Sequence, residues 1–331
     1  MTAAPLSFDR QRNWWAVHAR TAYLFRRTSR LVVSLVLLLT ATFFMIHLVP
    51  GDPVRAALGT TAPANLVAAR REALGLDKPL LTQYVDYVRN ILHGNFGTSL
   101  VSGEQVTDVI RERGPSTFRL AGLAFVVAIG IAVPLGLLMA ALTRDSKRRR
   151  IELGFTATAG AIAAVPSFLS AVALVYVFAV TIHWFPVAGQ GGVSSYVLPV
   201  ASLALGPIAA LSRIVRVEGL RVLEQDYVRT ARGKRLPARI IYLRHALPNT
   251  LTPTLTIAGL LVGGLVAGTV LVENIFAWPG LGTSLVSAVA QKDFSTVQAI
   301  AVIFGAVVLL ANFTVDILLG AIDPRSTITD A

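Results

Sequence analysis

The feature that most constrains this chain is a set of long runs that contain no Asp, Glu, Lys or Arg. There are six of them: 31–49, 120–142, 153–182, 193–212, 250–272 and 294–315. A helix needs about 20 apolar residues to cross the hydrocarbon core of a bilayer, and every run reaches 19 or more. Hydrophobic residues make up 54% of the 331 residues and charged residues 15%, whereas a soluble domain carries about 25% charged residues. The sequence therefore predicts an all-α, polytopic membrane protein with six transmembrane helices.

The formal net charge of +12 is unevenly distributed along the chain. Segments 1–30, 143–152 and 213–249 carry +5, +3 and +6, and 316–331 carries −2. Segment 50–115 holds seven basic and seven acidic residues. Because Lys and Arg in short loops mark the cytoplasmic side, we expect both termini to lie inside and 50–115 outside. The positive surplus therefore indicates topology in an inner membrane, and nucleic acid is not an expected partner.

The predicted organisation alternates spans with connecting segments. From the N-terminus it reads: cytoplasmic basic segment 1–30, span 31–49, extracytoplasmic insert 50–115, span 116–142, cytoplasmic loop 143–152, span 153–182, extracytoplasmic loop 183–192, span 193–212, cytoplasmic segment 213–249, span 250–272, extracytoplasmic loop 273–293, span 294–315 and cytoplasmic C-terminus 316–331. Trp14 and Trp15 among the N-terminal arginines suit contact with membrane lipid headgroups, and a partly ordered basic tail is an equal alternative for this segment.

Local patterns refine two of these segments. In the insert, apolar residues at helical spacing predict one helix over 79–92 and a second, short helix over 104–113. The run 153–182 contains Pro166 and is long enough for a tilted or proline-kinked helix. The run 193–212 contains Pro199 and Pro207, which permit either a broken helix or an ordinary kink.

The cytoplasmic segment 213–249 is too long for a simple turn. Leu220, Leu223, Tyr227 and Ala231 fall at helical spacing with arginines close by. A basic amphipathic helix of this kind binds an anionic lipid surface or docks against a partner protein. Spacing alone does not favour one of these alternatives.

Several kinds of chemistry are absent from the sequence. The chain has no cysteine, and its five histidines lack metal-ligand spacing. The pair Gly233-Lys234 lacks the earlier glycine and the following Ser or Thr of a phosphate-binding P-loop. The apolar runs carry no paired acid and base that would support an intramembrane enzyme or ion-coupled transport. We therefore predict no catalytic residue, no metal site and no cofactor.

Several linked motifs give the chain a resemblance to a known family. They are His47–Pro53 (HLVPGDP), Leu74–Leu80 (LGLDKPL), Gly97–Leu100 (GTSL), Asp226–Arg232 (DYVRTAR), Arg244–Asn249 (RHALPN), Val272–Gly282 (VENIFAWPGLG) and Asp323–Arg325 (DPR). In this order and spacing the chain resembles the permease subunits of bacterial ABC importers for dipeptides, oligopeptides and nickel, from about residue 24 to 326. The fold that the resemblance implies is that of a type I ABC importer permease.

The resemblance also implies a role for the cytoplasmic segment. In such permeases a short "EAA" coupling helix sits in a cleft of the ATPase subunit and transmits the movement that ATP drives. By this resemblance Arg229, Thr230 and Ala231 take the Glu-Ala-Ala positions, and the pattern's glycine falls at Arg235 instead of Gly233. The ATPase-coupling residues implied are Leu220, Leu223, Asp226, Tyr227, Arg229, Thr230, Ala231, Arg232, Gly233, Lys234 and Arg235. Arginine does not relieve backbone strain as glycine does, so the resemblance does not define the geometry of the turn after the coupling helix.

The partners implied are a second, homologous permease subunit, two ATP-binding subunits and an extracytoplasmic substrate-binding protein. The implied function is one half of the translocation path for di- and oligopeptides, with ATP hydrolysed on the partner chains. A nickel or haem-like cargo of the same importer class is the alternative. A membrane-embedded enzyme and a lone channel are more remote alternatives.

Overall fold

Helices form almost all of the structure. The computed structural model describes residues 8–48, 52–59, 61–73, 75–144 and 148–322, and outside its helices these hold only turns and one isolated β-bridge, Thr98–Gln105. The elements are α1 (Phe8–His47), α2 (Pro53–Leu58), α3 (Ala64–Ala73), α4 (Leu80–Leu92), α5 (Val106–Thr143), α6 (Arg149–Ala164), α7 (Ser167–Leu174), η1 (Val175–Thr181), α8 (Val193–Leu223), α9 (Asp226–Gly233), α10 (Ala238–Ile240), η2 (Ile241–Ala246), α11 (Leu247–Ile275), α12 (Leu281–Ala290) and α13 (Phe294–Ile322). The all-α expectation is confirmed.

Within these residues, five helical segments are long and apolar enough to cross a membrane. They are Tyr23–His47, Val106–Thr143, Val193–Leu223, Ala238–Ile275 and Phe294–Gly320. A sixth span results if the bent pair Arg149–Ala164 and Ser167–Thr181 is counted as one. Each of the six charge-free runs thus overlaps one of these segments over most of its length.

The bent pair turns by 96° at Pro166. Val165 is extended, and Pro166 is the N-cap residue of α7. Steric conflict with the proline ring drives the preceding residue out of the helical region, so α6 ends and α7 starts in a new direction. In contrast, α8 runs unbroken through Pro199 and Pro207.

The helices extend further than the charge-free runs predicted. The proposed cytoplasmic segment 1–30 is helical from Phe8, and the side chains of residues 8–22 lie outside those described. Residues 106–113 of the predicted short helix over 104–113 are helical, but they form the first turns of α5 and not a separate helix. Absence of charge marks only the part of a helix in hydrocarbon, whereas backbone hydrogen bonds continue the helix into water.

The segment 213–249 is likewise mostly helical. Its first part completes α8 up to Leu223, α9 follows after a two-residue break, and a new helix starts at Ala238. The motif at Asp323–Arg325 and the residues Val49–Gly51 of the first motif lie outside the described residues.

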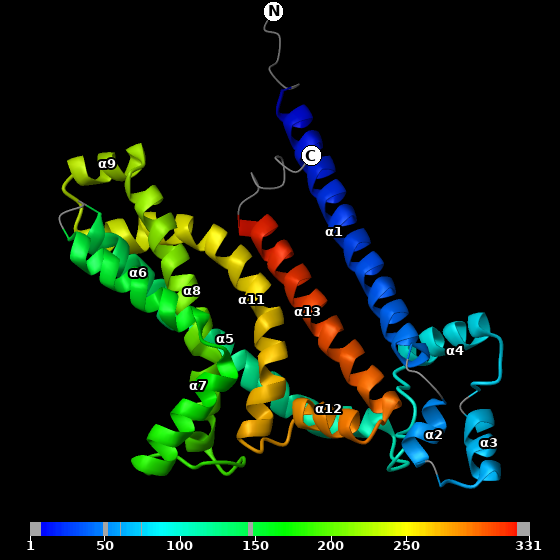
Figure 1. The fold of residues 1–331 in the computed structure, drawn as a ribbon. Helices are drawn as coiled ribbons and strands as arrows, with labels where there is room; N and C mark the ends of the chain where they lie inside the picture. The colour runs from blue at the N-terminus through cyan, green and yellow to red at the C-terminus, as the bar shows by residue number, and fades with distance from the viewer. Residues whose placement is uncertain (1–7, 49–51, 60, 74, 145–147, 323–331) are drawn as a thin grey trace, which may run out of the picture.

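Closely packed α5 and α8 form the centre of the bundle (Figure 1). A Cβ on Gly136 would lie 2.5 Å from the Val215 Cβ and 2.7 Å from the Ser212 carbonyl oxygen. One on Gly219 would lie 3.0 Å from the Ala140 Cβ. Small residues therefore let the two backbones approach, as is usual for membrane helices.

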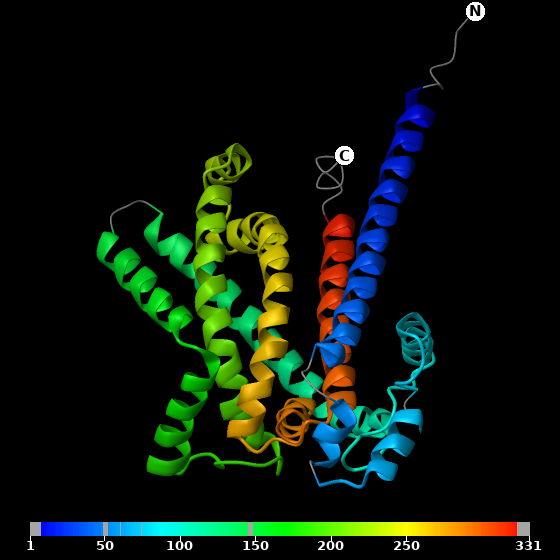
Figure 2. The same cartoon turned by 45° about the vertical axis from the view of Figure 1, so that its right-hand side comes forward.

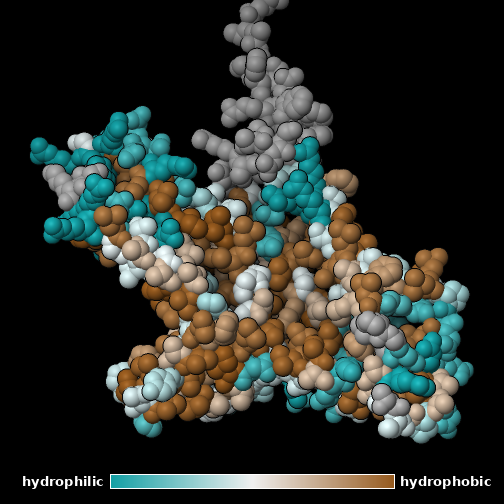
Figure 3. Space-filling model, in the orientation of Figure 1, coloured by the Kyte–Doolittle hydropathy of each residue, from teal (hydrophilic) through white to brown (hydrophobic). Residues whose placement is uncertain are grey.

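The two ends of the bundle differ in character. α9 and the start of α1 lie at one end, whereas α2, α3 and α4 gather around the opposite end of α1 (Figures 1 and 2). An apolar band crosses the middle of the surface, and hydrophilic surface lies over the α9 end and over the insert (Figure 3). This distribution is that of a protein embedded in a bilayer.

Candidate functional site

The helix α9 is the best-defined candidate for contact with a partner. Gln225 is extended and starts a new helix two residues after α8 ends. The negative charge of Asp226 in the first turn interacts favourably with the positive end of the helix dipole. The Thr230 hydroxyl donates to the Asp226 carbonyl oxygen at 2.9 Å. An exposed Arg229–Asp226 ion pair at 3.5 Å adds little to its stability. A helix of eight residues depends on tertiary packing.

That packing comes from one apolar cluster, which we call the anchor cluster. It consists of Ala140, Val222, Leu223, Val228, Ala231, Ile241 and Ala246, with Leu220, Leu236 and Tyr242 partly buried against it. It joins the inner side of α9 to α5, α8 and the helix that leads into α11. The anchor cluster therefore attaches α9 to three transmembrane segments.

The structure separates the residues that spacing had placed on one stripe. Leu223 and Ala231 are buried within the chain, and Leu220 packs against them, so these three are not on the outer surface of α9. Tyr227 is 43% exposed. The exposed residues of the predicted set are Asp226, Tyr227, Arg229, Thr230, Gly233, Lys234 and Arg235, with Arg232 half-buried. Partial burial raises the pKa of Tyr227, so its hydroxyl is neutral at physiological pH.

Arg235, which stands where the family pattern has glycine, adopts a strained backbone. Its φ is +53°, in the left-handed region that disfavours residues with a Cβ. The Arg235 N–H donates to the Arg232 carbonyl at 2.8 Å, which closes the turn after α9. Gly233, in contrast, is the last residue of the helix.

We expect Arg235→Gly to stabilise this turn by about 1 kcal/mol, because glycine reaches left-handed φ without steric cost. Amide exchange across 226–236 should slow in the variant. Gly233→Ala, at a position with open space around it, is the control for a general effect on helix propensity. Unchanged or faster exchange in Arg235→Gly would show that the turn is not strained.

A buried arginine ties three helices together at the same end. Arg216 is 8% exposed, and its Nη2 lies 2.7 Å from Glu152 Oε1 of α6. Its Nε donates to the Thr143 hydroxyl of α5 at 3.0 Å. The contacts fix α6 to the α5–α8 pair next to the anchor cluster.

At the opposite end, α12 is held by a buried carboxylate. Glu273 is fully buried, and its Oε2 accepts the N–H groups of Gly282 at 2.7 Å and Thr283 at 3.3 Å. A Cβ on Gly280 or Gly282 would collide with this carboxylate. These contacts explain why the VENIFAWPGLG motif has glycine at positions 280 and 282, since any larger residue would clash with the Glu273 carboxylate.

Contacts from α5 also hold the start of α12, and we call the groups that bind it, Glu273, Thr117 and Arg113, the seat of α12. The Leu281 N–H donates to the Thr117 hydroxyl at 2.8 Å, and Arg113 Nη1 donates to the Ser284 hydroxyl at 3.0 Å. Trp278 is fully buried, with its ring edge-on to Tyr196 at 4.6 Å. Sequence reasoning missed Glu273, because it had placed residue 273 in a loop, whereas α11 continues to Ile275.

The insert is folded and fastened to the spans. Asp293 is 4% exposed and accepts hydrogen bonds from the Ser99 hydroxyl at 2.6 Å and the Leu100 N–H at 3.0 Å. The Tyr87 hydroxyl of α4 lies 3.0 Å from the Thr42 hydroxyl of α1. Burial raises the pKa of Tyr87 to about 12.

Ion pairs hold the shorter helices of the insert. Arg71 lies 3.2 Å from Asp52 and 3.0 Å from Asp77, which links the ends of α2 and α3 to the turn before α4. Partial burial raises the pKa of Asp52, but hydrogen bonds from Arg71 and the Val54 N–H outweigh this and leave the pKa below its ordinary value.

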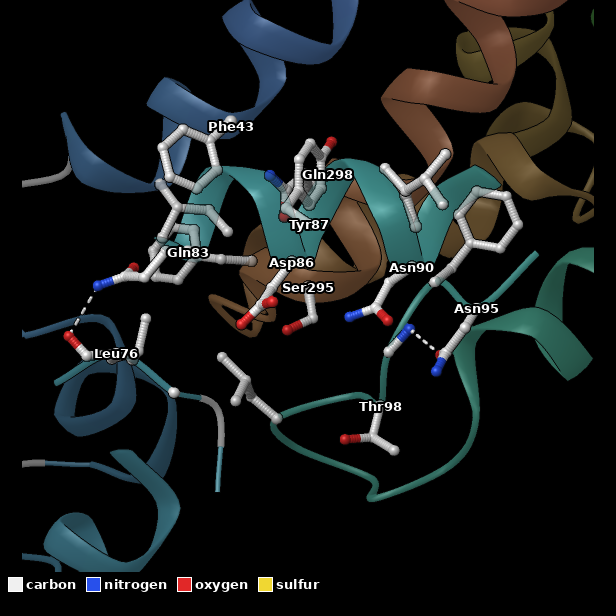
Figure 4. Close-up of a pocket in the computed structure, with 18 of the residues that line it drawn as sticks. Phe43, Leu76, Gln83, Asp86, Tyr87, Asn90, Asn95, Thr98, Ser295 and Gln298 are labelled. Carbon is white, nitrogen blue, oxygen red and sulfur yellow. Dashed lines mark hydrogen bonds between the residues drawn. The ribbon is translucent and has the colours of Figure 1, made fainter. Parts of the chain in front are cut away.

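A cavity of about 810 Å³ opens between the insert and the ends of α1 and α13 (Figure 4). Aromatic rings of Phe43, Tyr87, Phe96 and Phe294 form part of its wall, and polar side chains form most of the remainder. No group of three or more His, Cys, Asp and Glu side chains among the described residues could hold a metal ion.

Comparison with known proteins decides the family. A family model described as "Binding-protein-dependent transport system inner membrane component" matches residues 132–328, and the model of the corresponding N-terminal region matches residues 20–121. The chain belongs to this family. It is thus an inner-membrane, multi-pass permease component of an ABC importer, and the family comprises transport proteins and not enzymes.

Relatives of the permease cover nearly its whole length. It is 36% identical over 304 residues to the glutathione transport system permease protein GsiC of Pectobacterium atrosepticum, which covers 91% of this chain and 97% of the relative. It is 34% identical over 302 residues to the protein of the same name from Escherichia coli K12, with the same coverage. A solved structure titled as an amino acid ABC transporter with histidines aligns at a TM-score of 0.46 and 18% identity, over 66% of this chain and 94% of that one.

Proposed function

We propose that this permease forms one half of the translocation path of an ATP-driven importer of short peptides, and that α9 is its ATPase-coupling helix. The observation that carries the proposal is the two-sided character of α9. Its outer face offers Tyr227 among basic residues, while its inner face is built into the anchor cluster. A face that was only adsorbed on lipid would not require such a rigid attachment to three spans.

Peptide cargo is supported by the relatives, which are named for glutathione transport. Glutathione is itself a short peptide, so the cargo class fits the di- and oligopeptide importers that the motifs resemble. A nickel or haem-like cargo is the alternative, and the uptake experiment below distinguishes it.

The partners in this proposal are a second, homologous permease, two ATP-binding subunits and a substrate-binding protein outside. The family name supports dependence on a binding protein, and the absence of a P-loop in this sequence supports ATP hydrolysis on other chains. The folded insert and α12 offer a surface on which the binding protein would dock.

The proposed orientation places both termini and α9 in the cytoplasm and the insert outside, on charge grounds. Because the chain has no cysteine, single cysteines at Asn95 and Lys234 report the two sides directly. We expect an impermeant thiol reagent to label the Asn95→Cys variant in spheroplasts, and Lys234→Cys only after the cells are broken. The reverse pattern would overturn the orientation.

The test of the function is purification of the tagged permease from its native membrane in mild detergent. We expect a homologous permease and ATP-binding subunits to copurify, and reconstituted vesicles to import a labelled tripeptide when ATP and binding protein are supplied. The permease alone should hydrolyse no ATP. Import of Ni²⁺ or haem without peptide import would replace the peptide proposal by its alternative, and ATP hydrolysis by the lone chain would refute the assigned role.

A further inference from the structure

The cavity beside the insert has the construction of a ligand site. Its volume of about 810 Å³ lies in the range of roughly 300–1,000 Å³ that is typical of small-molecule sites. It is walled by elements far apart in the sequence: the end of α1, α4, the loop before α5 and the start of α13. Asp293 and Tyr87 hold these elements together through the hydrogen bonds described above, so the cavity is part of a fixed architecture.

Several polar side chains converge on this space, and three of them have no partner among the described residues. The side chains of Asp86, Asn90 and Ser295 extend toward the loop that carries Thr98 (Figure 4). Asn90, Ser295 and Thr98 make no side-chain hydrogen bond to another described residue. An amide and two hydroxyls offer both donors and acceptors, so water fills such a cavity until a ligand with the same capacity replaces it.

Charged residues of both signs also line the cavity. Lys78 and Asp86 pair with each other at 2.8 Å. Glu72 and Arg89 line the same space and have no ion pair with another described residue. A ligand that carries an ammonium and a carboxylate can satisfy both, while its amide groups meet Asn90 and Ser295.

We propose that the cavity is a peptide-binding site on the permease itself, which takes a short zwitterionic peptide before it enters the translocation path. The chemistry is that of a free peptide: a charge at each end, amides between, and side chains that the rings of Phe43, Tyr87, Phe96 and Phe294 can contact. A phospholipid headgroup lacks the row of amides. The proposal rests on the peptide cargo proposed above, and it concerns the cavity between the insert and the ends of α1 and α13.

The test uses the purified permease, with the subunits that copurify, in lipid nanodiscs without binding protein. The probe is the tripeptide Ala-photoleucine-Ala, whose diazirine inserts on illumination. We expect adducts on residues 86–98 and 294–299, competed by unlabelled Ala-Leu-Ala. The double variant Asn90→Ala, Ser295→Ala should weaken binding about tenfold through lost hydrogen bonds. Thr82→Ala, Ser287→Ala is the matched control, because both residues are exposed and lie outside the cavity.

The charge requirement gives a sharper readout. N-acetylation of the probe should weaken binding to the native protein about fivefold, as for a partly exposed ion pair, and should have no effect in Glu72→Gln. C-terminal amidation should behave in the same way with Arg89→Gln. If the substitutions only disturbed the fold, each modification of the probe would weaken binding to the variant as much as binding to the native protein.

Three outcomes would overturn the proposal: adducts outside the cavity, a phospholipid that copurifies in the cavity and is not displaced by peptide, or no labelling of the cavity in this assay without binding protein. Failure of the proposed function looks different. If the complex binds the probe in the cavity but imports no peptide, the proposed binding site stands and the proposed peptide transport is refuted. If the complex imports peptide but the cavity is not labelled, peptide transport stands and the binding site is refuted.

Discussion

Replacing Tyr227 by aspartate is expected to abolish peptide uptake while the membrane spans still insert. The residue lies on the exposed face of α9, outside the segments that cross the membrane. If that face enters a cleft of an ATP-binding subunit, an aromatic side chain there supplies a large contact area at low entropic cost. The substitution loses this contact and buries a carboxylate without a partner.

An unpaired buried charge costs about 3–5 kcal/mol, which corresponds to a loss of affinity of more than about a hundredfold. The ATP-binding subunits should therefore dissociate on mild detergent washing, and uptake into vesicles should fall to background. The measurement is subunit stoichiometry after affinity purification, together with uptake of a labelled tripeptide.

Two comparisons make this result specific. Tyr227→Phe keeps the ring and should keep stoichiometric ATP-binding subunits. Leu223→Ala removes a side chain from the anchor cluster and should weaken the attachment of α9 without adding charge. Full uptake and an intact complex in Tyr227→Asp would show that α9 is not the coupling helix, and that its basic face serves lipid contact instead.

The transmembrane segments could be predicted because one physical requirement governs them. A charged side chain in hydrocarbon is costly, so charge-free runs identify the spans. Their ends could not be predicted in the same way, because α1, α5 and α8 continue into water, where backbone hydrogen bonding tolerates polar residues.

The exposed face of α9 could be predicted only in part. Helical spacing grouped Leu223 with Tyr227, but that inference assumes one continuous helix. The helix is interrupted after Leu223, and the backbone of Gln225 is extended. Because a new helix then begins at Asp226, its periodicity is independent of that of α8, and Leu223 and Tyr227 face in different directions. The positive φ of Arg235 could not be predicted, because the sequence shows that arginine stands where the family pattern has glycine but not which conformation the turn adopts.

The cavity and the seat of α12 were beyond sequence reasoning. Both depend on contacts between residues separated by many positions, such as Ser99 with Asp293 and Leu281 with Thr117. Spacing gives no information on such contacts. The glycines at 280 and 282 were the one local sign that another group approaches the backbone there.

Glu273→Ala is expected to release α12 from its seat. The carboxylate accepts two backbone N–H groups at the start of that helix, where the first turn has no partners of its own. Removing it leaves buried donors unsatisfied, at about 1–3 kcal/mol for each, and opens a void beside Gly280 and Gly282. We expect amide exchange across 281–290 to accelerate by about tenfold or more.

Glu273→Gln retains an oxygen that can accept from Gly282 and should exchange close to the native rate. Glu112→Ala removes an exposed glutamate of α5 and should leave α12 unaffected. If Glu273→Ala exchanged no faster than Glu112→Ala, the carboxylate would not be what holds the helix.

The reason for a glutamate at this depth follows from the geometry. Carboxylates are costly in an apolar protein interior unless hydrogen bonds satisfy them, and this one is fully buried. The start of α12 offers N–H donors and the positive end of a helix dipole, and both N–H bonds go to one carboxylate oxygen, Oε2. Because α12 also contacts α5 and α13, this single residue couples the seat of α12 to the ends of three transmembrane segments. Glu273→Ala should therefore impair uptake even with the ATP-binding subunits fully retained, which distinguishes its effect from that of Tyr227→Asp.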